Sequence, residues 1–133
     1  MSEVGCGSGG AVKLKPRILI VDDDLEIGDL LKVVLQEEGY AVEFAASAVE
    51  GLSLLQRETF HLVVLDLKMP GMDGVEALGR IIGEQRGLPV IIHSSSVSHK
   101  DNYLTWSAAD FVVKTGDLSV LKESIARILI DNK

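Results

Sequence analysis

The sequence predicts an α/β protein built as a three-layer sandwich, in which a five-stranded parallel sheet lies between helices on both faces. Five short apolar runs rich in Val and Ile alternate along the chain with amphipathic stretches, and each run is too short to be a helix. Parallel neighbours require crossover connections, which the amphipathic stretches supply. The strands are expected at residues 18–21, 42–45, 62–65, 90–92 and 111–113.

Five helices are expected after these strands. Apolar residues at helical spacing over 27–35 predict the first, and Gly39 lies where a left-handed C-terminal cap would fall. Ser47 and Asp73 are the expected N-caps of the second and third helices, each with a Glu three residues later as in a capping box. A fourth, shorter helix is expected over 99–106.

The last helix is expected to run from about Asp117. In each helix the apolar residues at helical spacing are expected to face the core. They are Ile27, Leu30, Leu31, Val34 and Leu35 in the first helix, Val49, Leu52 and Leu55 in the second, Val75, Leu78 and Ile82 in the third, and Leu118, Leu121, Ile125, Ile128 and Leu129 in the last.

Length and composition fit one soluble domain. The 133 residues contain 47% apolar and 25% charged residues, and a domain of this size buries about two-thirds of the surface that its unfolded chain exposes. Residues 1–15 are rich in Gly and Ser and are expected to form a flexible N-terminal extension, with the folded domain at 16–133. The sequence does not reveal whether the domain stands alone or is cut from a longer protein.

Charge and targeting signals limit the partners and the compartment. The net charge of −7 opposes a phosphate backbone, so no direct nucleic-acid binding is expected. No apolar run is long enough to span a bilayer, and the first residues lack a secretory signal, so no membrane association is expected. The single cysteine, Cys6, agrees with a reducing compartment, and the predicted location is the cytoplasm.

The chemistry-bearing residues follow the apolar runs, where the functional crevice of an open α/β sheet lies. Asp22, Asp23 and Asp24 follow the first strand, Asp66 the third, Ser94 to Ser96 the fourth, and Lys114 the fifth. An all-oxygen carboxylate cluster with few ligands suits hydrated Mg²⁺. Asp24 is expected to be only the N-cap of the first helix, and His93 is expected to be packed beside the site.

These residues suit phosphoryl transfer to a carboxylate. A carboxylate acts as a nucleophile toward phosphorus, and Mg²⁺ beside it neutralises charge on the transferring group. Asp66 has the surroundings for that role. Ser94 and Lys114 are placed to hold phosphoryl oxygens, by hydroxyl donation and by an ammonium charge.

Four segments carry a resemblance to a known family. RILIVDDD at 17–24, LDLKMPGMDG at 65–74, PVIIHSSS at 89–96 and ADFVVK at 109–114 resemble the signatures of bacterial two-component response-regulator receiver domains, in the family's order. The match runs from about residue 16 to the end. The resemblance implies a flavodoxin-like fold with strand order 2-1-3-4-5.

The resemblance also implies residue roles. Asp66 matches the phosphoacceptor, Asp23 a direct Mg²⁺ ligand, Asp22 an acid that acts mostly through metal-bound water, and the backbone carbonyl of Lys68 a further ligand. Ser94 matches the switch Ser/Thr, Phe111 the rotating aromatic and Lys114 the family's lysine. When Ser94 moves toward the phosphate, Phe111 is expected to turn into the vacated space and to change the partner-binding surface.

The function implied is that of a regulatory phosphoacceptor, which is no enzyme beyond self-catalysed phosphoryl transfer and autodephosphorylation. The expected partners are a sensor histidine kinase or phosphotransfer protein and a downstream effector protein. A dimer that forms on phosphorylation is left open. Thr115 stands where most receivers have Pro, commonly after a cis peptide bond, so the isomer of the Lys114–Thr115 bond is also left open.

Three other functions are compatible with parts of the pattern. Asp22 and Asp24 have the spacing of the nucleophile and general acid of a haloacid-dehalogenase-like phosphatase, although Glu26 departs from that motif and no cap domain remains. A flavodoxin-like cofactor carrier would share the fold, but its first loop cradles an anionic phosphate and here that loop is acidic. The third is a pseudo-receiver that only binds partners.

Overall fold

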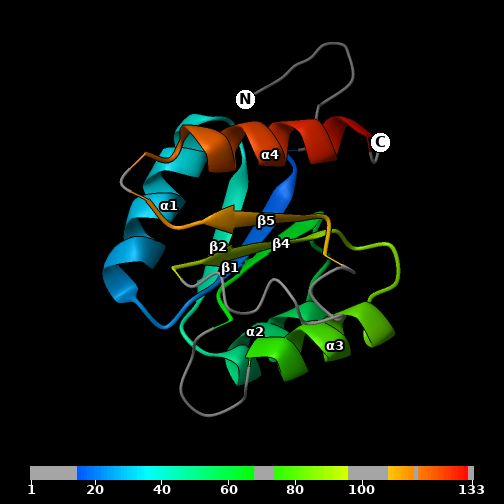
Figure 1. Cartoon of the computed structure of the whole chain (residues 1–133). Helices are drawn as coiled ribbons and strands as arrows, with labels where there is room; N and C mark the ends of the chain where they lie inside the picture. The colour runs from blue at the N-terminus through cyan, green and yellow to red at the C-terminus, as the bar shows by residue number, and fades with distance from the viewer. Residues whose placement is uncertain (1–14, 68–73, 96–107, 116, 132–133) are drawn as a thin grey trace.

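The computed structural model describes residues 15–67, 74–95, 108–115 and 117–131 (Figure 1). Its strands are β1 (Arg17–Val21), β2 (Ala41–Ala45), β3 (Leu62–Leu65), β4 (Val90–Ser94) and β5 (Asp110–Val113), and its helices are α1 (Leu25–Glu37), α2 (Ala48–Arg57), α3 (Gly74–Glu84) and α4 (Ser119–Asp131). The helix expected over 99–106 lies outside the described residues, so α4 corresponds to the predicted last helix. No helix in these ranges has the length and apolar character needed to cross a membrane.

The five strands form one parallel sheet in the order β2-β1-β3-β4-β5, which confirms the predicted architecture and strand order. The central strand β1 pairs Ile20 with Phe44 of β2 on one side and with Val64 of β3 on the other. Both ends of every strand lie within two residues of the predicted bounds. Continuous apolar runs fit here because both faces of a parallel sheet are buried.

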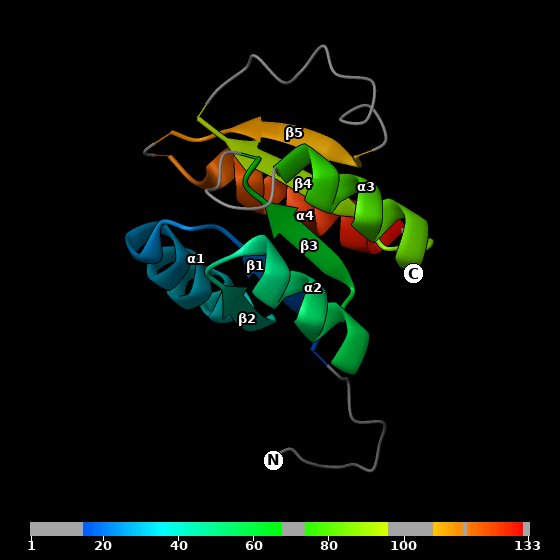
Figure 2. The ribbon, with the colours of Figure 1, turned by 90° about the horizontal axis from the view of Figure 1, so that it is seen from below.

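Helices cover both faces of the sheet, α1 and α4 on one and α2 and α3 on the other (Figures 1 and 2). Alternate strand residues divide between two apolar clusters, since successive side chains point to opposite faces. The cluster beneath α1 and α4 contains Ile18, Ile20, Leu31, Leu35, Val42, Leu62, Val64, Ile91, Val112, Leu121, Ile125 and Ile128. The cluster beneath α2 and α3 contains Leu19, Val21, Ala45, Leu52, Leu55, Phe60, Val63, Leu65, Leu67, Leu78, Ile81, Val90 and Ile92.

The predicted caps are confirmed where the structure describes them. The carboxylate of Asp24 accepts hydrogen bonds from the backbone N–H groups of Glu26 and Ile27 at the start of α1. Ser47 Oγ accepts from Glu50 N at 3.1 Å, and the returning Glu50 carboxylate accepts from the N–H of Ala46, one residue before the cap. Gly39 has the expected positive φ of 100°. Asp73 lies outside the described residues.

Two of the predicted core residues whose side chains the structure describes do not face the core; the side chain of Val75 lies outside that description. Val49 is 63% exposed and Leu30 is 48% exposed. Both helices approach the sheet through a glycine instead: a Cβ on Gly28 would lie 2.2 Å from the Phe44 ring, and one on Gly51 would lie 2.8 Å from Val21. These close approaches orient α1 and α2 so that Leu30 and Val49 face solvent.

Candidate functional site

Three of the residues predicted to form the site continue the sheet beyond its strand ends. The backbone N–H of Asp22 donates to Ala45, that of Asp66 to Val21 and that of Lys114 to Ser94, so each ladder runs past its strand. Asp22, Asp66 and Lys114 each stand two residues after a member of the cluster beneath α1 and α4. With the two-residue period of a strand, the three side chains share that face and converge at the carboxyl edge of the sheet.

Lys114 joins the two buried carboxylates. Its Nζ lies 2.8 Å from Oδ2 of Asp22 and 3.0 Å from Oδ2 of Asp66, while the side chains of Asp22 and Asp66 are only 3% and 6% exposed. Charge-assisted hydrogen bonds of this length are among the stronger ones in proteins. One ammonium therefore bridges the ends of β1 and β3 from the end of β5.

Asp23 completes a group of acids. Carboxylate oxygens of Asp22, Asp23 and Asp66 all lie within 4.8 Å of one another, with Asp23 exposed and the other two buried. Three carboxylates and one ammonium leave a net charge of −2, which one divalent cation neutralises. Hard oxygen donors that are partly open to solvent are the set Mg²⁺ prefers, so these residues fit that ion.

Burial dominates the electrostatics of this acid group. Burial raises the pKa of Asp22, and the charge of Asp66 adds to the rise, while the ammonium of Lys114 and the N–H of Asp24 oppose it. Burial alone would lower the pKa of Lys114, but its hydrogen bonds to Asp22 and Asp66 outweigh that effect and raise the pKa. Burial thus decides the direction of the pKa shift at Asp22, and the two carboxylate partners decide it at Lys114.

His93 is a buried neighbour of the site. It is 3% exposed, its Cα pairs with Val112 in the sheet register, and its Nδ1 has no hydrogen-bond partner in the part of the chain that the structure describes. Burial lowers the pKa of His93 to about 4; the charge of Lys114 adds to this effect, and that of Asp66 opposes it. His93 is thus packed, as predicted, and is neutral at pH 7.

Ser94 and Phe111 lie on the other face of the sheet. Ser94 is the last residue of β4, two residues longer than predicted, and is fully buried. It stands two residues after Ile92, so it belongs to the face covered by α2 and α3, against which Phe111 also packs. The hydroxyl and the aromatic ring therefore share a face near the end of the sheet. Lys68, the predicted carbonyl ligand, lies outside the described residues.

The loop after Lys114 departs from the pattern expected with proline. No peptide bond among the described residues is cis, so the Lys114–Thr115 bond is trans. Thr115 Oγ1 accepts from Asp117 N at 3.2 Å and donates to Asp117 O at 2.9 Å. Asp117 in turn accepts from Ser119 N at the start of α4. Side-chain hydrogen bonds of this kind are typical of tight turns.

Solved structures share this fold over most of the chain. A response regulator receiver domain protein from Methanospirillum hungatei is 35% identical, with a TM-score of 0.85 over 90% of this chain and 97% of that one. Response regulator TrrA of Thermotoga maritima, in complex with Mg²⁺ and BeF, is 34% identical, with a TM-score of 0.82 over 85% and 98%. TrrA in complex with histidine kinase ThkA gives 35% identity and a TM-score of 0.80 over 86% and 98%.

Curated relatives match over part of their length. Transcriptional regulatory protein GlrR of Escherichia coli is 38% identical over 110 residues, which are 81% of this chain and 25% of GlrR. An uncharacterised 14.6 kDa protein of Leptolyngbya boryana is 44% identical over 86 residues, 63% of this chain and 66% of that protein. The model of the response regulator receiver domain matches residues 18–126. With this match over most of its length and the fold that goes with it, the chain belongs to the response regulator receiver domain family.

Proposed function

We propose that this chain is the phosphoacceptor of a two-component phosphorelay and that Asp66 takes the phosphoryl group. The observation that carries the proposal is the placement of Asp66. It is buried, it is bonded to Lys114 at 3.0 Å, and it lies within 4.8 Å of the carboxylates of Asp22 and Asp23 at the carboxyl edge of the sheet. A nucleophile for phosphorus needs this combination of a carboxylate, an anchored cation and further oxygen ligands.

The transfer reaction balances without a further co-reactant. A carboxylate oxygen of Asp66 forms a bond to phosphorus while the P–N bond of a phosphohistidine breaks. The leaving imidazole keeps the electron pair and takes a proton. Lys114, which bonds Asp22 and Asp66 before transfer, becomes available to a phosphoryl oxygen as an ammonium donor, and its fixed charge offsets the added negative charge.

Mg²⁺ is the cofactor that this proposal requires. Asp22, Asp23 and Asp66 would hold it, together with the backbone carbonyl of Lys68. When bound, the ion supplies positive charge beside the phosphoryl oxygens, which otherwise meet three carboxylates. The complex of TrrA with Mg²⁺ and BeF supports this assignment, since that protein is 34% identical over 85% of the chain.

Phosphorylation would change the surface through Ser94 and Phe111. Moving a two-state equilibrium from 1:99 to 99:1 takes about 5.5 kcal/mol. Hydrogen bonds to charged groups contribute about 1.5 to 3 kcal/mol each, so contacts from Ser94 and Lys114 to the phosphoryl group are about sufficient. Because Ser94 and Phe111 share a face of the sheet, movement of the hydroxyl frees space beside the ring. The ring then carries the change to the surface of β5 and α4.

The partners follow from this role. A sensor histidine kinase or phosphotransfer protein would donate the phosphoryl group, and the complex of TrrA with histidine kinase ThkA supports such a donor. A downstream effector in the cytoplasm would recognise the changed surface. The chain itself would only transfer a phosphoryl group to itself and lose it by autodephosphorylation.

The decisive measurement is intact mass after incubation with acetyl phosphate, with and without Mg²⁺. Wild type should gain one phosphoryl group only with Mg²⁺, as the P–O bond of acetyl phosphate breaks and acetate leaves. Asp66→Asn should gain none. Asp29→Asn, which changes an exposed aspartate of α1, should react like wild type. If wild type gains no group and also fails to bind beryllofluoride, the chain is a pseudo-receiver. Steady turnover of a phosphate monoester would instead favour a phosphatase.

A further inference from the structure

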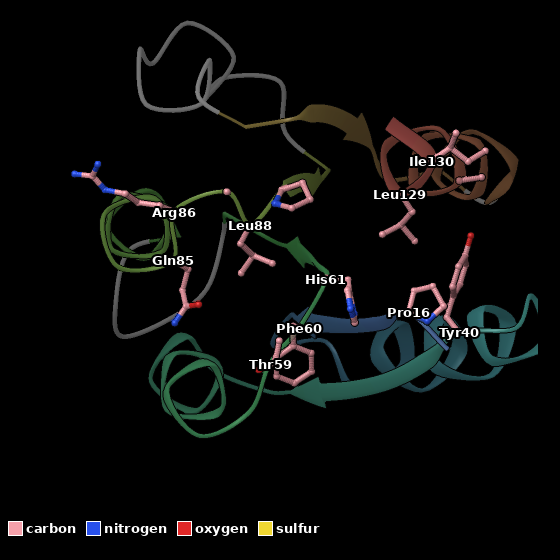
Figure 3. A pocket seen from close by; sticks show the side chains of 13 residues that line it. Pro16, Tyr40, Thr59, Phe60, His61, Gln85, Arg86, Leu88, Leu129 and Ile130 are labelled. Carbon is pink, nitrogen blue, oxygen red and sulfur yellow. The ribbon is translucent and has the colours of Figure 1, made fainter. Parts of the chain in front are cut away.

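A groove crosses the end of the sheet opposite Asp66. It has a volume of about 680 Å³ and lies under the amino ends of three strands, because Pro16, His61 and Pro89 directly precede β1, β3 and β4. Leu88 from the loop after α3 and Leu129 from α4 stand on either side of it, as Figure 3 shows. The lining is largely apolar, so water gains little by filling the groove.

The floor of the groove is held in a defined shape. The backbone N–H of Arg17 donates to Nδ1 of His61 at 2.9 Å, and the N–H of His61 donates to the carbonyl of Arg17 at 2.8 Å. The guanidinium of Arg17 lies 4.6 Å from the centre of the Phe60 ring and donates to Thr59 O at 2.9 Å. These contacts fix the loop before β3, so the groove is preformed and does not depend on an occupant to shape it.

The N-terminal segment is covalently attached at the groove, because Pro16 lines it. Fourteen residues precede Lys15, the first residue that the structure describes. The next residue is Pro16, whose carbonyl accepts a hydrogen bond from Ala41 N at 2.9 Å, which fixes its position. Consecutive Cα atoms are about 3.8 Å apart, so the Cα of Leu14 lies within about 7.6 Å of that of Pro16. Lys15 precedes a proline and is therefore restricted to extended backbone.

The residues at this point have the composition that the groove needs. Residues 11–14 read Ala-Val-Lys-Leu, so Val12 and Leu14 are two apart and share one side of an extended chain, with Lys13 on the other. Residues 1–10 contain four glycines and two serines and offer little apolar surface. Val12 and Leu14 are therefore the apolar pair of this spacing that lies nearest to the groove along the chain.

We propose that residues 11–14 occupy the groove, with Val12 and Leu14 packed between Leu88 and Leu129. This contact would join the four residues before Lys15 to the folded domain. It closes the amino end of the core by burying apolar surface on both partners. It also leaves the carboxyl edge, with Asp66, free for other proteins.

Methyl NMR on the full chain tests the contact directly. In a wild-type sample labelled at Val and Leu methyl groups, cross-relaxation peaks should connect Leu14 with Leu88 or Leu129. No such peak, with both sets of resonances assigned, would overturn the proposal. A sample that mixes labelled and unlabelled chains distinguishes contacts within one chain from contacts between two chains. Peaks that arise between different chains would mean that a second copy fills the groove, which also overturns the proposal.

A double variant and a matched control give a second test, in which methyl resonances and dye binding are measured. Replacing Val12 and Leu14 together by Ser should shift the Leu88 and Leu129 methyl resonances and should increase binding of an apolar fluorescent dye several-fold. The control is Val49→Ser on α2, which removes an apolar side chain that is 63% exposed and lies outside the groove lining. It should leave both readouts as in wild type. Equal behaviour of the double variant and wild type would contradict the proposal.

Discussion

The Nζ atom of Lys114 lies 3.0 Å from Oδ2 of Asp66, a residue 48 positions earlier in the chain. The same ammonium lies 2.8 Å from Asp22, so it occupies the space between the ends of β1 and β3. A phosphoryl group on Asp66 has to compete with these two contacts for Lys114. The ion pairs of the unmodified protein are therefore part of what phosphorylation rearranges.

Lys114→Met should destabilise the protein when Mg²⁺ is absent. The variant leaves Asp22 and Asp66 buried together without their cation, and losing a hydrogen bond to a charged group costs about 1.5 to 3 kcal/mol of unfolding free energy. Urea unfolding in EDTA measures the loss, and added Mg²⁺ should restore more stability to the variant than to wild type. Lys122→Met is the control, because Lys122 and Glu38 are 3.9 Å apart and both partly exposed, so about 0.5 kcal/mol or less is expected. Similar losses in the two variants would contradict the role of the Lys114 bridge.

Ser94→Ala should separate phosphorylation from the response to it. Asp66 keeps its surroundings, so uptake from acetyl phosphate should be close to that of wild type. The amide chemical-shift changes of β5 and α4 on beryllofluoride binding should be smaller than in wild type. The variant lacks the hydroxyl that would move toward the phosphoryl group and free space for Phe111. Ser95→Ala, at the exposed next residue, should respond like wild type. If Ser94→Ala and wild type show equal shift changes, the switch does not use Ser94.

His93 should make stability depend on pH in the acid range. Its pKa is about 4 in the folded protein and about 6.5 when unfolded, so between these values the unfolded chain binds the proton and the folded one does not. The contribution is fully present above pH 6.5 and is lost as the pH falls toward 4. The loss amounts to about 3 kcal/mol, since one pKa unit corresponds to about 1.36 kcal/mol.

Urea unfolding at a series of pH values without Mg²⁺ measures this effect. His93→Val should remove most of the pH dependence in this range, because the buried imidazole is then absent from the folded protein. If His93→Val retains the slope of wild type, another group is responsible for it.

Gly28→Ala should destabilise the packing of α1 on the sheet. The added Cβ would lie 2.2 Å from the Phe44 ring, so the ring or the helix has to move, at a cost of about 1 to 3 kcal/mol. Gly83→Ala is the matched control, since its Cβ meets nothing within 4 Å and alanine favours a helix by up to about 1 kcal/mol. Thermal unfolding should show opposite signs for the two. Adding Phe44→Leu should recover part of the Gly28→Ala loss.

The strands, their order along the chain and the residues at their carboxyl ends could be predicted from the sequence alone. Buried parallel strands are short continuous apolar runs, so Leu62 to Leu65 could be recognised without any partner strand. The end of such a run places the next residue at the functional edge, which is why Asp22, Asp66 and Lys114 were predicted together. The caps at Asp24 and Ser47 also depend only on neighbours in the chain.

How the elements face one another depends on tertiary contacts that the sequence pattern does not contain. Leu30 and Val49 fit the helical spacing of core residues, but the contacts of Gly28 with Phe44 and of Gly51 with Val21 turn them toward solvent. The double ion pair of Lys114 and the groove beneath the strands likewise join residues far apart in sequence. Local patterns set periodicity and chain direction, whereas helix rotation and side-chain partners depend on packing between distant segments, which no local pattern contains.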